Sequence, residues 1–219
     1  MNKPSLSIVI PTYNERDNIS KIVTRLKKTL KGINYEIIFV DDNSPDGTSD
    51  EIKLFIKNTS RINLIHRIGR RGLSGAVIEG IYAAKAELVG VMDCDLQHDE
   101  SKLLDMLDLF SKSSSLDLVI GSRFTGDGEI SDKAFSKIRE IGSRIITIII
   151  KKILSINSTD PLSGFFMVRK ESFLKCSDNL QTQGFKILAD FLSVSGKTIK
   201  IKEVGYKFKN RILGESKMS

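Results

Sequence analysis

The sequence has 219 residues, of which 40% are hydrophobic, and a formal net charge of +7. A chain of this length and composition can form one large α/β domain or two small ones around a full core, so a disordered protein is excluded. The longest apolar run, residues 145–150, is far shorter than the roughly 20 residues that cross a bilayer, so we expect no transmembrane helix.

In chain order the sequence predicts strands that alternate with helices. The strands are expected at residues 5–10, 35–40, 62–66, 88–92 and 116–120, and the helices at residues 18–30, 48–56, 72–84 and 102–110. Near-continuous apolar strands in such an alternation are typical of a mostly parallel sheet with helices on both faces. We therefore predict an α/β fold with a mostly parallel central sheet flanked by helices.

The N-terminus and the cysteines indicate the cellular compartment of the protein. The N-terminus passes directly into the first predicted strand and leaves no room for a signal peptide, so we expect a cytosolic catalytic domain. Cys94 and Cys176 have neither metal-ligand spacing nor a second thiol nearby, and we expect both to be free.

Basic residues gather in the C-terminal portion, from Lys197 onward. Basic surface suits nucleic acid, an anionic membrane or a phosphorylated substrate. Only 7% of the residues are aromatic and tryptophan is absent, so the sequence offers no platform for stacking bases. We therefore expect no nucleic-acid partner.

Polar residues follow several predicted strands at the point where each strand ends. They are the turn 11–15, the pair Asp41 and Asp42, the acidic segment 93–97 and Arg123. In open parallel sheets ligands bind outside the carboxyl ends of the strands. We therefore expect these clusters to line one site.

The segment from Asp93 to Gln97 is the most informative part of that edge. Residues 88–92 are expected to form a buried strand, in which successive side chains alternate between faces, so we expect Asp93 and Asp95 to point one way and Cys94 the other. Two carboxylates followed by an amide suit Mg²⁺ or Mn²⁺, which keep open positions for water and substrate phosphates. On its own, the pattern also fits a solvated acidic turn.

Two common phosphate-binding patterns are missing from the sequence. It has no G-x-G-x-x-G after the first strand and no G-x-x-x-x-G-K-[ST], which disfavours a dinucleotide-dependent redox enzyme. A cation at Asp93 and Asp95 could instead neutralise a diphosphate, while the carboxylate of Asp41 could accept hydrogen bonds from a base. This arrangement is typical of an enzyme that uses a nucleotide sugar.

Several motifs resemble those of family 2 glycosyltransferases, which have the GT-A fold. They are PTYNE at 11–15, DDNSPDGT at 41–48, DCDLQH at 93–98 and GSR at 121–123. Three more resemble the dolichol-phosphate mannose synthases within that family: DPLSGFF at 160–166, GFKIL at 184–188 and RILGESK at 211–217. The resemblance implies one GT-A catalytic domain over residues 1–219, with a nucleotide- and metal-binding half at 1–124 and an acceptor-binding half at 125–219.

The resemblance also implies roles for single residues. The implied nucleotide-sugar contacts are Pro11, Tyr13, Glu15, Asp41, Asp93, Asp95, Gln97, Arg123, Arg211 and Lys217, and the implied metal ligands are Asp93, Asp95 and Gln97. Arg123, Arg139 and Ser143 match, or lie beside, positions that hold the acceptor phosphate. The implied catalytic residues are Asp95, Arg123, Arg139 and Arg211.

The reaction implied by the resemblance is inverting transfer of a hexose, with mannose from GDP-mannose as the first choice, to dolichyl or polyprenyl phosphate. The implied cofactor is Mg²⁺ or Mn²⁺. A phosphate monoester carries about −1.5 to −2 charges near neutral pH and needs no general base. If the acceptor were a hydroxyl, Asp190, in the helix expected after residues 184–186, would be the candidate base; otherwise it would orient a guanidinium such as Arg211.

Two alternatives stay open at the level of function. One is transfer of another sugar, from UDP-glucose or UDP-N-acetylglucosamine, to a lipid phosphate or a saccharide hydroxyl. The other is a catalytically silent nucleotide-sugar-binding module.

A polyprenyl phosphate remains in the bilayer, so the resemblance implies a peripheral protein at the cytosolic face of a membrane. Residues 135–154 combine isoleucines with lysines and arginines, which predicts either a helix at the membrane interface or one packed on the sheet. Family members usually continue beyond the motif at 211–217. A membrane-anchoring segment or subunit outside this chain is therefore a further expectation.

Overall fold

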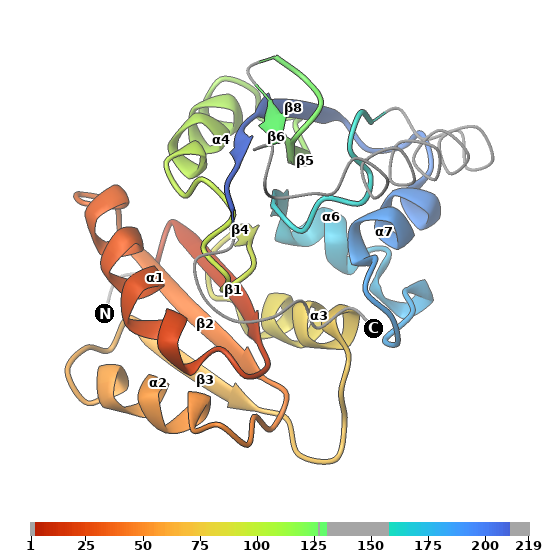
Figure 1. Ribbon diagram of the computed structural model, residues 1–219. Coiled ribbons are helices and arrows are strands. Elements are labelled where there is room, and N and C mark those ends of the chain that lie inside the picture. Colours follow the sequence, from red (N-terminus) through yellow and green to blue (C-terminus); the bar gives the residue numbers. More distant parts are fainter. Residues whose placement is uncertain (1–2, 127, 131–157, 211–219) are drawn as a thin grey trace.

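The computed structural model describes residues 3–126, 128–130 and 158–210. In its N-terminal part strands alternate with helices (Figure 1). These elements are β1 (Leu6–Thr12), α1 (Arg16–Thr29), β2 (Tyr35–Asp41), α2 (Thr48–Ile56), β3 (Ile62–His66), α3 (Leu73–Ala83), β4 (Leu88–Val91), α4 (Lys102–Ser111) and β5 (Leu118–Ser122). Each strand and helix expected from the sequence is confirmed, with ends that move by at most two residues.

The C-terminal part adds shorter elements. They are β6 (Glu129–Ile130), β7 (Phe166–Arg169), α6 (Lys170–Leu174), the 3₁₀ helix η1 (Ser177–Asn179), α7 (Ile187–Ser195), β8 (Ile201–Gly205) and β9 (Lys207–Phe208). The helix expected around Asp190 is α7. The expected interface helix at 135–154 lies outside the described residues.

The main sheet has seven strands in the order β3-β2-β1-β4-β7-β5-β8, and β6 pairs with β9 in a second, small sheet. β1 is parallel to β2 and β4, and β5 is parallel to β8. Only β7 runs antiparallel to its neighbours β4 and β5 among the described strands of this sheet. The predicted α/β fold with a mostly parallel sheet is confirmed.

The sheet separates two hydrophobic cores, because alternate residues of a strand face opposite sides. Ile8 and Phe39 pack on the side of α1, α2 and α4, whereas Val9 and Val40 pack on the side of α3, α6 and α7. Helix α1 forms because its buried apolar residues recur at the spacing of one helical face. These residues are Ile19, Ile22, Val23 and Leu26.

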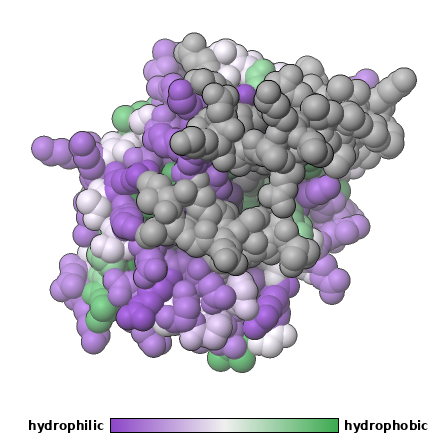
Figure 2. All heavy atoms as spheres, viewed as in Figure 1, coloured by the Kyte–Doolittle hydropathy of each residue, from purple (hydrophilic) through white to green (hydrophobic). Residues whose placement is uncertain are grey.

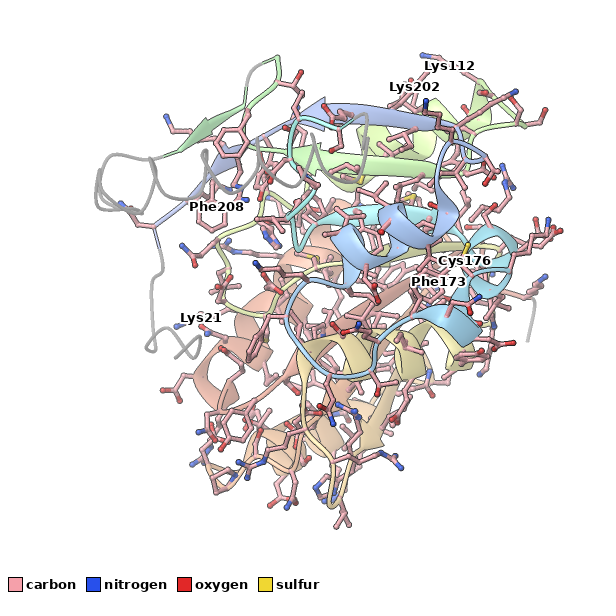
Figure 3. All side chains as sticks on the ribbon, turned by 90° about the vertical axis from the view of Figure 1, so that its right-hand side faces the viewer. Lys21, Lys112, Phe173, Cys176, Lys202 and Phe208 are labelled. Carbon is pink, nitrogen blue, oxygen red and sulfur yellow. The ribbon has the colours of Figure 1, made fainter. Side chains whose placement is uncertain are left out.

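Two phenylalanines show how far apart parts of the two cores lie. Phe208 belongs to the core on the α1 side and Phe173 to the core on the α3 side. Figure 3 labels both residues and shows them on opposite sides of the view. Side chains near Phe173 are thus remote from those near Phe208.

The surface seen in Figure 2 is mostly hydrophilic where the chain is described. No helix in the described ranges is long and apolar enough to cross a membrane. Cys94 is buried, Cys176 is partly buried and both are free thiols, as the sequence predicts.

Candidate active site

The carboxyl ends of the parallel strands form one edge of the sheet, and the polar clusters predicted from the sequence lie in the loops that follow them. The antiparallel direction of β7 brings a further segment, residues 158–165, to the same edge, because the chain enters β7 there. Loops from both halves of the chain therefore meet where ligands of open sheets bind.

The acidic segment lies in a loop rather than on a strand. Pairing between β4 and β7 stops at Val91 and Phe166, two residues before Asp93. The expectation that Asp93 and Asp95 continue the strand is therefore wrong, and strand alternation does not set the directions of their side chains. The side chain of Asp93 is 37% exposed, whereas Asp95 is buried and accepts a hydrogen bond from the backbone N–H of Gln97 at 3.1 Å.

Backbone strain also gathers at this edge. In the described part of the chain three non-glycine residues have a left-handed φ: Asn14 (54°) after β1, Asn43 (56°) after β2 and Leu96 (65°) after β4. Asparagine tolerates this conformation, whereas for a residue such as leucine it costs roughly 1–2 kcal/mol. Such strained positions cluster at functional sites, which gives independent support to this edge as the site.

Gln97 joins the acidic loop to the C-terminal part of the chain. Its Nε2 donates to the carbonyl oxygen of Lys209 at 2.9 Å, and the N–H of Lys209 donates back to the carbonyl oxygen of Gln97 at 2.9 Å. The described residues end at Asn210. Four predicted site residues lie outside the described ranges: Arg139, Ser143, Arg211 and Lys217. Their roles stay predictions.

Arg123 follows β5 and is fixed by a partner that the sequence did not single out. Its Nε and one terminal nitrogen donate to the two carboxylate oxygens of Asp160, each at 2.8 Å, and its backbone N–H donates to the same carboxylate at 3.1 Å. Burial alone would lower the pKa of the guanidinium, but the hydrogen bonds and charge of Asp160 raise this pKa above its usual value. A guanidinium has five N–H donors, so the pair leaves donors for a phosphate.

Aromatic rings complete the surroundings of Arg123. The guanidinium carbon lies 5.6 Å from the ring centre of Phe208 and 5.4 Å from that of Phe124. A cation held against such rings by a buried carboxylate keeps one orientation. Asp160 belongs to the motif at 160–166, which the sequence analysis quoted. Nothing in the sequence showed that the carboxylate of Asp160 pairs with Arg123.

The residues predicted to surround the nucleoside lie at the ends of β1 and β2. Asp41 is fully buried, and its carboxylate accepts hydrogen bonds from Thr12 Oγ1 (3.0 Å), Ser44 N (3.0 Å), Ser44 Oγ (2.5 Å) and Ser49 Oγ (2.8 Å). These bonds fix the turn after β2. Contact between Asp41 and a base stays a prediction.

Other predicted nucleoside contacts are nearby. The guanidinium carbon of Arg71 lies 4.9 Å from the ring centre of Tyr13, and Glu15 accepts a hydrogen bond from Asn18 Nδ2 at 2.7 Å. Pro11 is buried within β1. The structure thus places Pro11 at the end of β1, and Tyr13 and Glu15 in the loop that follows it.

A buried ionic network, absent from the sequence analysis, ties β2 and β3 to α3. The guanidinium of Arg67 pairs with Asp42 and donates to Glu79 Oε1 at 3.1 Å, and the other oxygen of Asp42 accepts from the N–H of Gly72 at 2.8 Å. A Cβ at Gly75 would lie 2.6 Å from a nitrogen of Arg67. The start of α3 is therefore held close to the site.

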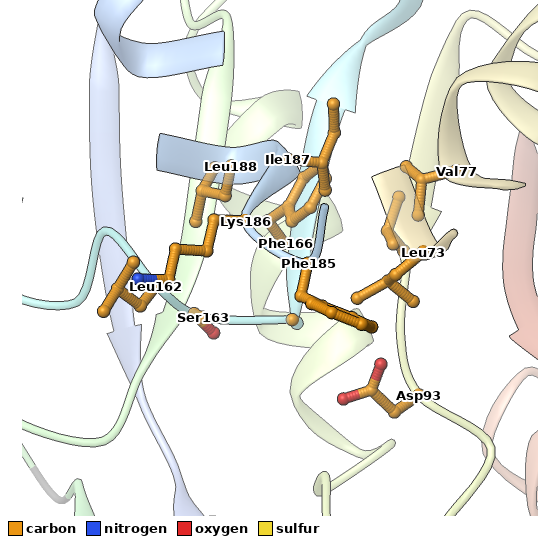
Figure 4. Close-up of a pocket in the computed structure, with 12 residues that line it drawn as sticks. Leu73, Val77, Asp93, Leu162, Ser163, Phe166, Phe185, Lys186, Ile187 and Leu188 are labelled. Atoms are coloured by element: carbon orange, nitrogen blue, oxygen red, sulfur yellow. The ribbon is translucent and has the colours of Figure 1, made fainter. Parts of the chain in front are cut away.

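A pocket opens beside Asp93, between the start of α3, the segment before β7 and the start of α7 (Figure 4). Figure 4 shows the ring of Phe185 next to the carboxylate of Asp93, while Lys186 extends toward Leu162 and Ser163. Asp190 accepts a hydrogen bond from the backbone N–H of Gln181 at 2.7 Å, which closes the loop that carries Phe185.

The donor atoms of the acidic loop fit a hard divalent cation. Within the described residues no three or more His, Cys, Asp and Glu side chains are grouped to hold a metal ion. The ligands implied by the resemblance, Asp93, Asp95 and the amide oxygen of Gln97, would leave other positions of a cation to substrate phosphates and water. This incomplete set of protein ligands is the usual one for Mg²⁺ at phosphate-binding sites.

The family model for glycosyl transferase family 2 matches residues 7–176. The chain belongs to glycosyl transferase family 2. The resemblance read from the motifs is confirmed, and so is the expectation of an enzyme of the glycosyltransferase class.

Three curated relatives of the chain share the same name. Dolichol-phosphate mannosyltransferases from Pyrococcus furiosus, Mycosarcoma maydis and Saccharomyces cerevisiae are 38%, 35% and 33% identical to the chain over 97%, 98% and 97% of its length. The match spans 59% of the Pyrococcus protein, 74% of the Mycosarcoma protein and 80% of the yeast protein.

Solved structures support the fold. Glucosyl-3-phosphoglycerate synthase from Mycobacterium tuberculosis, in complex with Mn²⁺, UDP-glucose and phosphoglyceric acid, is 18% identical with a TM-score of 0.66 and covers 92% of this chain and 70% of its own. Mannosyl-3-phosphoglycerate synthase from Rubrobacter xylanophilus is 17% identical with a TM-score of 0.68 and covers 96% and 68%. The glycosyltransferase has the GT-A fold.

Proposed function

We propose that this glycosyltransferase transfers mannose from GDP-mannose to dolichyl or another polyprenyl phosphate, with inversion at the anomeric carbon. The names of relatives that match nearly the whole chain support the sugar and the lipid acceptor. GDP as the nucleotide rests on the family resemblance. The observation that carries the proposal is the mutual hydrogen bonding of Gln97 and Lys209, which brings the acidic loop to the segment that precedes Arg211.

The proposed division of roles follows the edge of the sheet. Asp93, Asp95 and Gln97 would hold Mg²⁺ or Mn²⁺, and this cation would stabilise the negative charge of the leaving diphosphate. Mn²⁺ in a related GT-A structure supports a divalent cation. The nucleoside would lie against the first two loops, on Pro11, Tyr13, Glu15 and Asp41, with Arg211 and Lys217 on the phosphates.

The acceptor phosphate would bind Arg123, with Arg139 and Ser143 as the other proposed contacts. Because Asp160 fixes Arg123 in one orientation, the remaining donors can direct the phosphate oxygen at the anomeric carbon. An anionic phosphate needs no general base. The hydrogen bond from Gln181 to Asp190 supports a role for Asp190 in holding its loop.

The test is transfer of radiolabelled sugar to a short polyprenyl phosphate from GDP-mannose, UDP-glucose and UDP-N-acetylglucosamine, each with Mg²⁺, with Mn²⁺ and with EDTA. The proposal predicts metal-dependent product from GDP-mannose. Product from a UDP-sugar alone would replace the donor, and binding of a nucleotide without any product would contradict the proposed acceptor.

A lipid acceptor also requires the enzyme to reach a bilayer, and we propose that it does so as a peripheral protein on the cytosolic face through residues 135–154. A separate anchoring segment or subunit would act together with these residues. Replacing Ile145, Ile146 and Ile149 with serine should abolish flotation with anionic liposomes while circular dichroism stays unchanged. Ile68→Ser, at a residue that is 72% exposed in the turn after β3, is the control. Unchanged flotation of the triple variant would contradict the interface.

A further inference from the structure

His98 follows the acidic loop and lies in a cluster of aromatic side chains. It is only 2% exposed. Its ring stacks on Phe165 at 5.2 Å with an interplanar angle of 14°, and it meets the edge of Tyr206 at 5.6 Å and the tilted ring of Phe208 at 5.9 Å. These contacts leave the imidazole a single orientation.

Both nitrogens of the imidazole face Asp93. The backbone N–H of Asp93 donates to Nδ1 at 3.2 Å, and Nε2 lies 3.6 Å from Oδ2 of the same residue. An Nδ1 that accepts a hydrogen bond carries no proton, so in the neutral ring the proton is on Nε2, the nitrogen that lies 3.6 Å from the carboxylate. One ring thus contacts the main chain and the side chain of the same aspartate.

The backbone of Gly164 limits Asp93 from another direction. A Cβ on Gly164 would lie 2.8 Å from Oδ2 and 3.2 Å from Oδ1 of Asp93, closer than side chains tolerate. Gly164 and Phe165 belong to the same segment before β7, so the segment that stacks on His98 also lies against the carboxylate.

We propose that His98 is a positioning residue, which holds the backbone and the carboxylate of Asp93 in the orientation that binds the divalent cation and the donor diphosphate. This inference rests on the proposed metal-binding role of Asp93. It assigns a task to a side chain that would otherwise be a buried aromatic residue of the core. Residues that orient a metal ligand typically change metal affinity or activity by about 10- to 100-fold when they are replaced.

The experiment compares Mn²⁺ affinity, measured by electron paramagnetic resonance in the presence of GDP, for the full chain and for His98→Phe. Phenylalanine keeps the stacked ring and removes both nitrogens. We expect Mn²⁺ to bind about 10- to 100-fold more weakly, and in the transfer assay we expect kcat to fall while KM for the polyprenyl phosphate stays unchanged. His98→Asn restores an acceptor near the position of Nδ1 and should recover part of the affinity.

Phe173→Leu is the matched control for lost packing. Phe173 is fully buried in the core on the other side of the sheet, far from Phe208 (Figure 3), whose ring lies against His98. It should lower the melting temperature and leave Mn²⁺ affinity unchanged. If His98→Phe does not fold, the near-isosteric pair His98→Leu and His98→Asn replaces it, with tighter Mn²⁺ binding expected for asparagine.

Wild-type Mn²⁺ affinity in folded His98→Phe, or equal affinities in the leucine and asparagine variants, would overturn the positioning role. The affinity measurement does not depend on which sugar is transferred. If the wild-type chain binds Mn²⁺ but gives no mannosyl product, the proposed reaction fails while the role of His98 is still tested.

Discussion

Side chains at the active-site edge are oriented by partners that lie far away in the sequence. Arg123 is held by Asp160, 37 residues further along, and Gln97 by Lys209, 112 residues further along. The Arg123–Asp160 pair is almost fully removed from water, with side-chain exposures of 11% and 0%. In such a pair each partner depends on the other, because an uncompensated buried charge is costly.

Asp160→Ala should lower the free energy of unfolding by about 3–5 kcal/mol, because it leaves the charge of Arg123 buried without its partner. Urea denaturation measures the change. Asp108→Ala is the control: it breaks an ion pair with Lys112 whose side chains are 53% and 67% exposed, and we expect no measurable change. Equal stabilities of the two variants would contradict the importance of the buried pair.

Residue-level chemistry was only partly visible in the sequence. The motifs predicted which loops carry the site, because a motif is local. They could not show that the Asp41 carboxylate accepts a hydrogen bond from Thr12, 29 residues earlier in the chain, or that His98 is buried against Phe165. Such properties depend on contacts between distant segments, which no local pattern contains.

Helix α3 illustrates how one element sets the geometry of the site. A Cβ at Gly80 would lie 2.3 Å from Val9 Cγ1 and 3.1 Å from Val40 Cγ2, so the helix approaches β1 and β2 closely because residue 80 has no side chain. The same helix begins at Leu73, which lines the pocket beside Asp93 (Figure 4). Its distance from the sheet therefore affects the active site.

Gly80→Ala should destabilise the protein by about 1–3 kcal/mol through overpacking, although alanine favours a helix over glycine by about 1 kcal/mol. Thermal denaturation of the single variant and of the double variant with Val9→Ala measures this effect. Because Val9→Ala removes the clashing methyl groups, the loss in the double variant should be smaller than the sum of the two single losses. A stabilised Gly80→Ala variant would contradict the close approach.

Elements in the first part of the chain were predictable because apolar strands and amphipathic helices alternate there at full length. β7 was not predicted: it has only four residues and is inserted antiparallel between β4 and β5. β9 has two residues and pairs with β6. Short strands are specified by their partners rather than by their own sequence pattern.

At the scale of the whole molecule, the site is built from both parts of the chain. The first part supplies the acidic loop, the loops after β1 and β2, and Arg123, whereas the second supplies Asp160, the loop of Phe185 and the backbone of Lys209. Strand β8 joins the parts, since it extends the main sheet beside β5 (Figure 1). Asp95, in the loop after β4, is therefore the residue whose replacement tests this site most directly.

The measurement that tests the account most directly is mannose transfer from GDP-mannose to a polyprenyl phosphate by the wild-type chain and by Asp95→Asn. Asparagine keeps the Oδ1 that accepts from Gln97, so the loop should persist while the charge is lost. We expect wild-type transfer that EDTA abolishes, and a loss of about 100-fold or more in Asp95→Asn with an unchanged unfolding curve. Asp105→Asn, which removes an exposed carboxylate from α4, should retain activity. Full transfer by Asp95→Asn, or by the wild-type chain in EDTA, would contradict the metal-dependent mechanism.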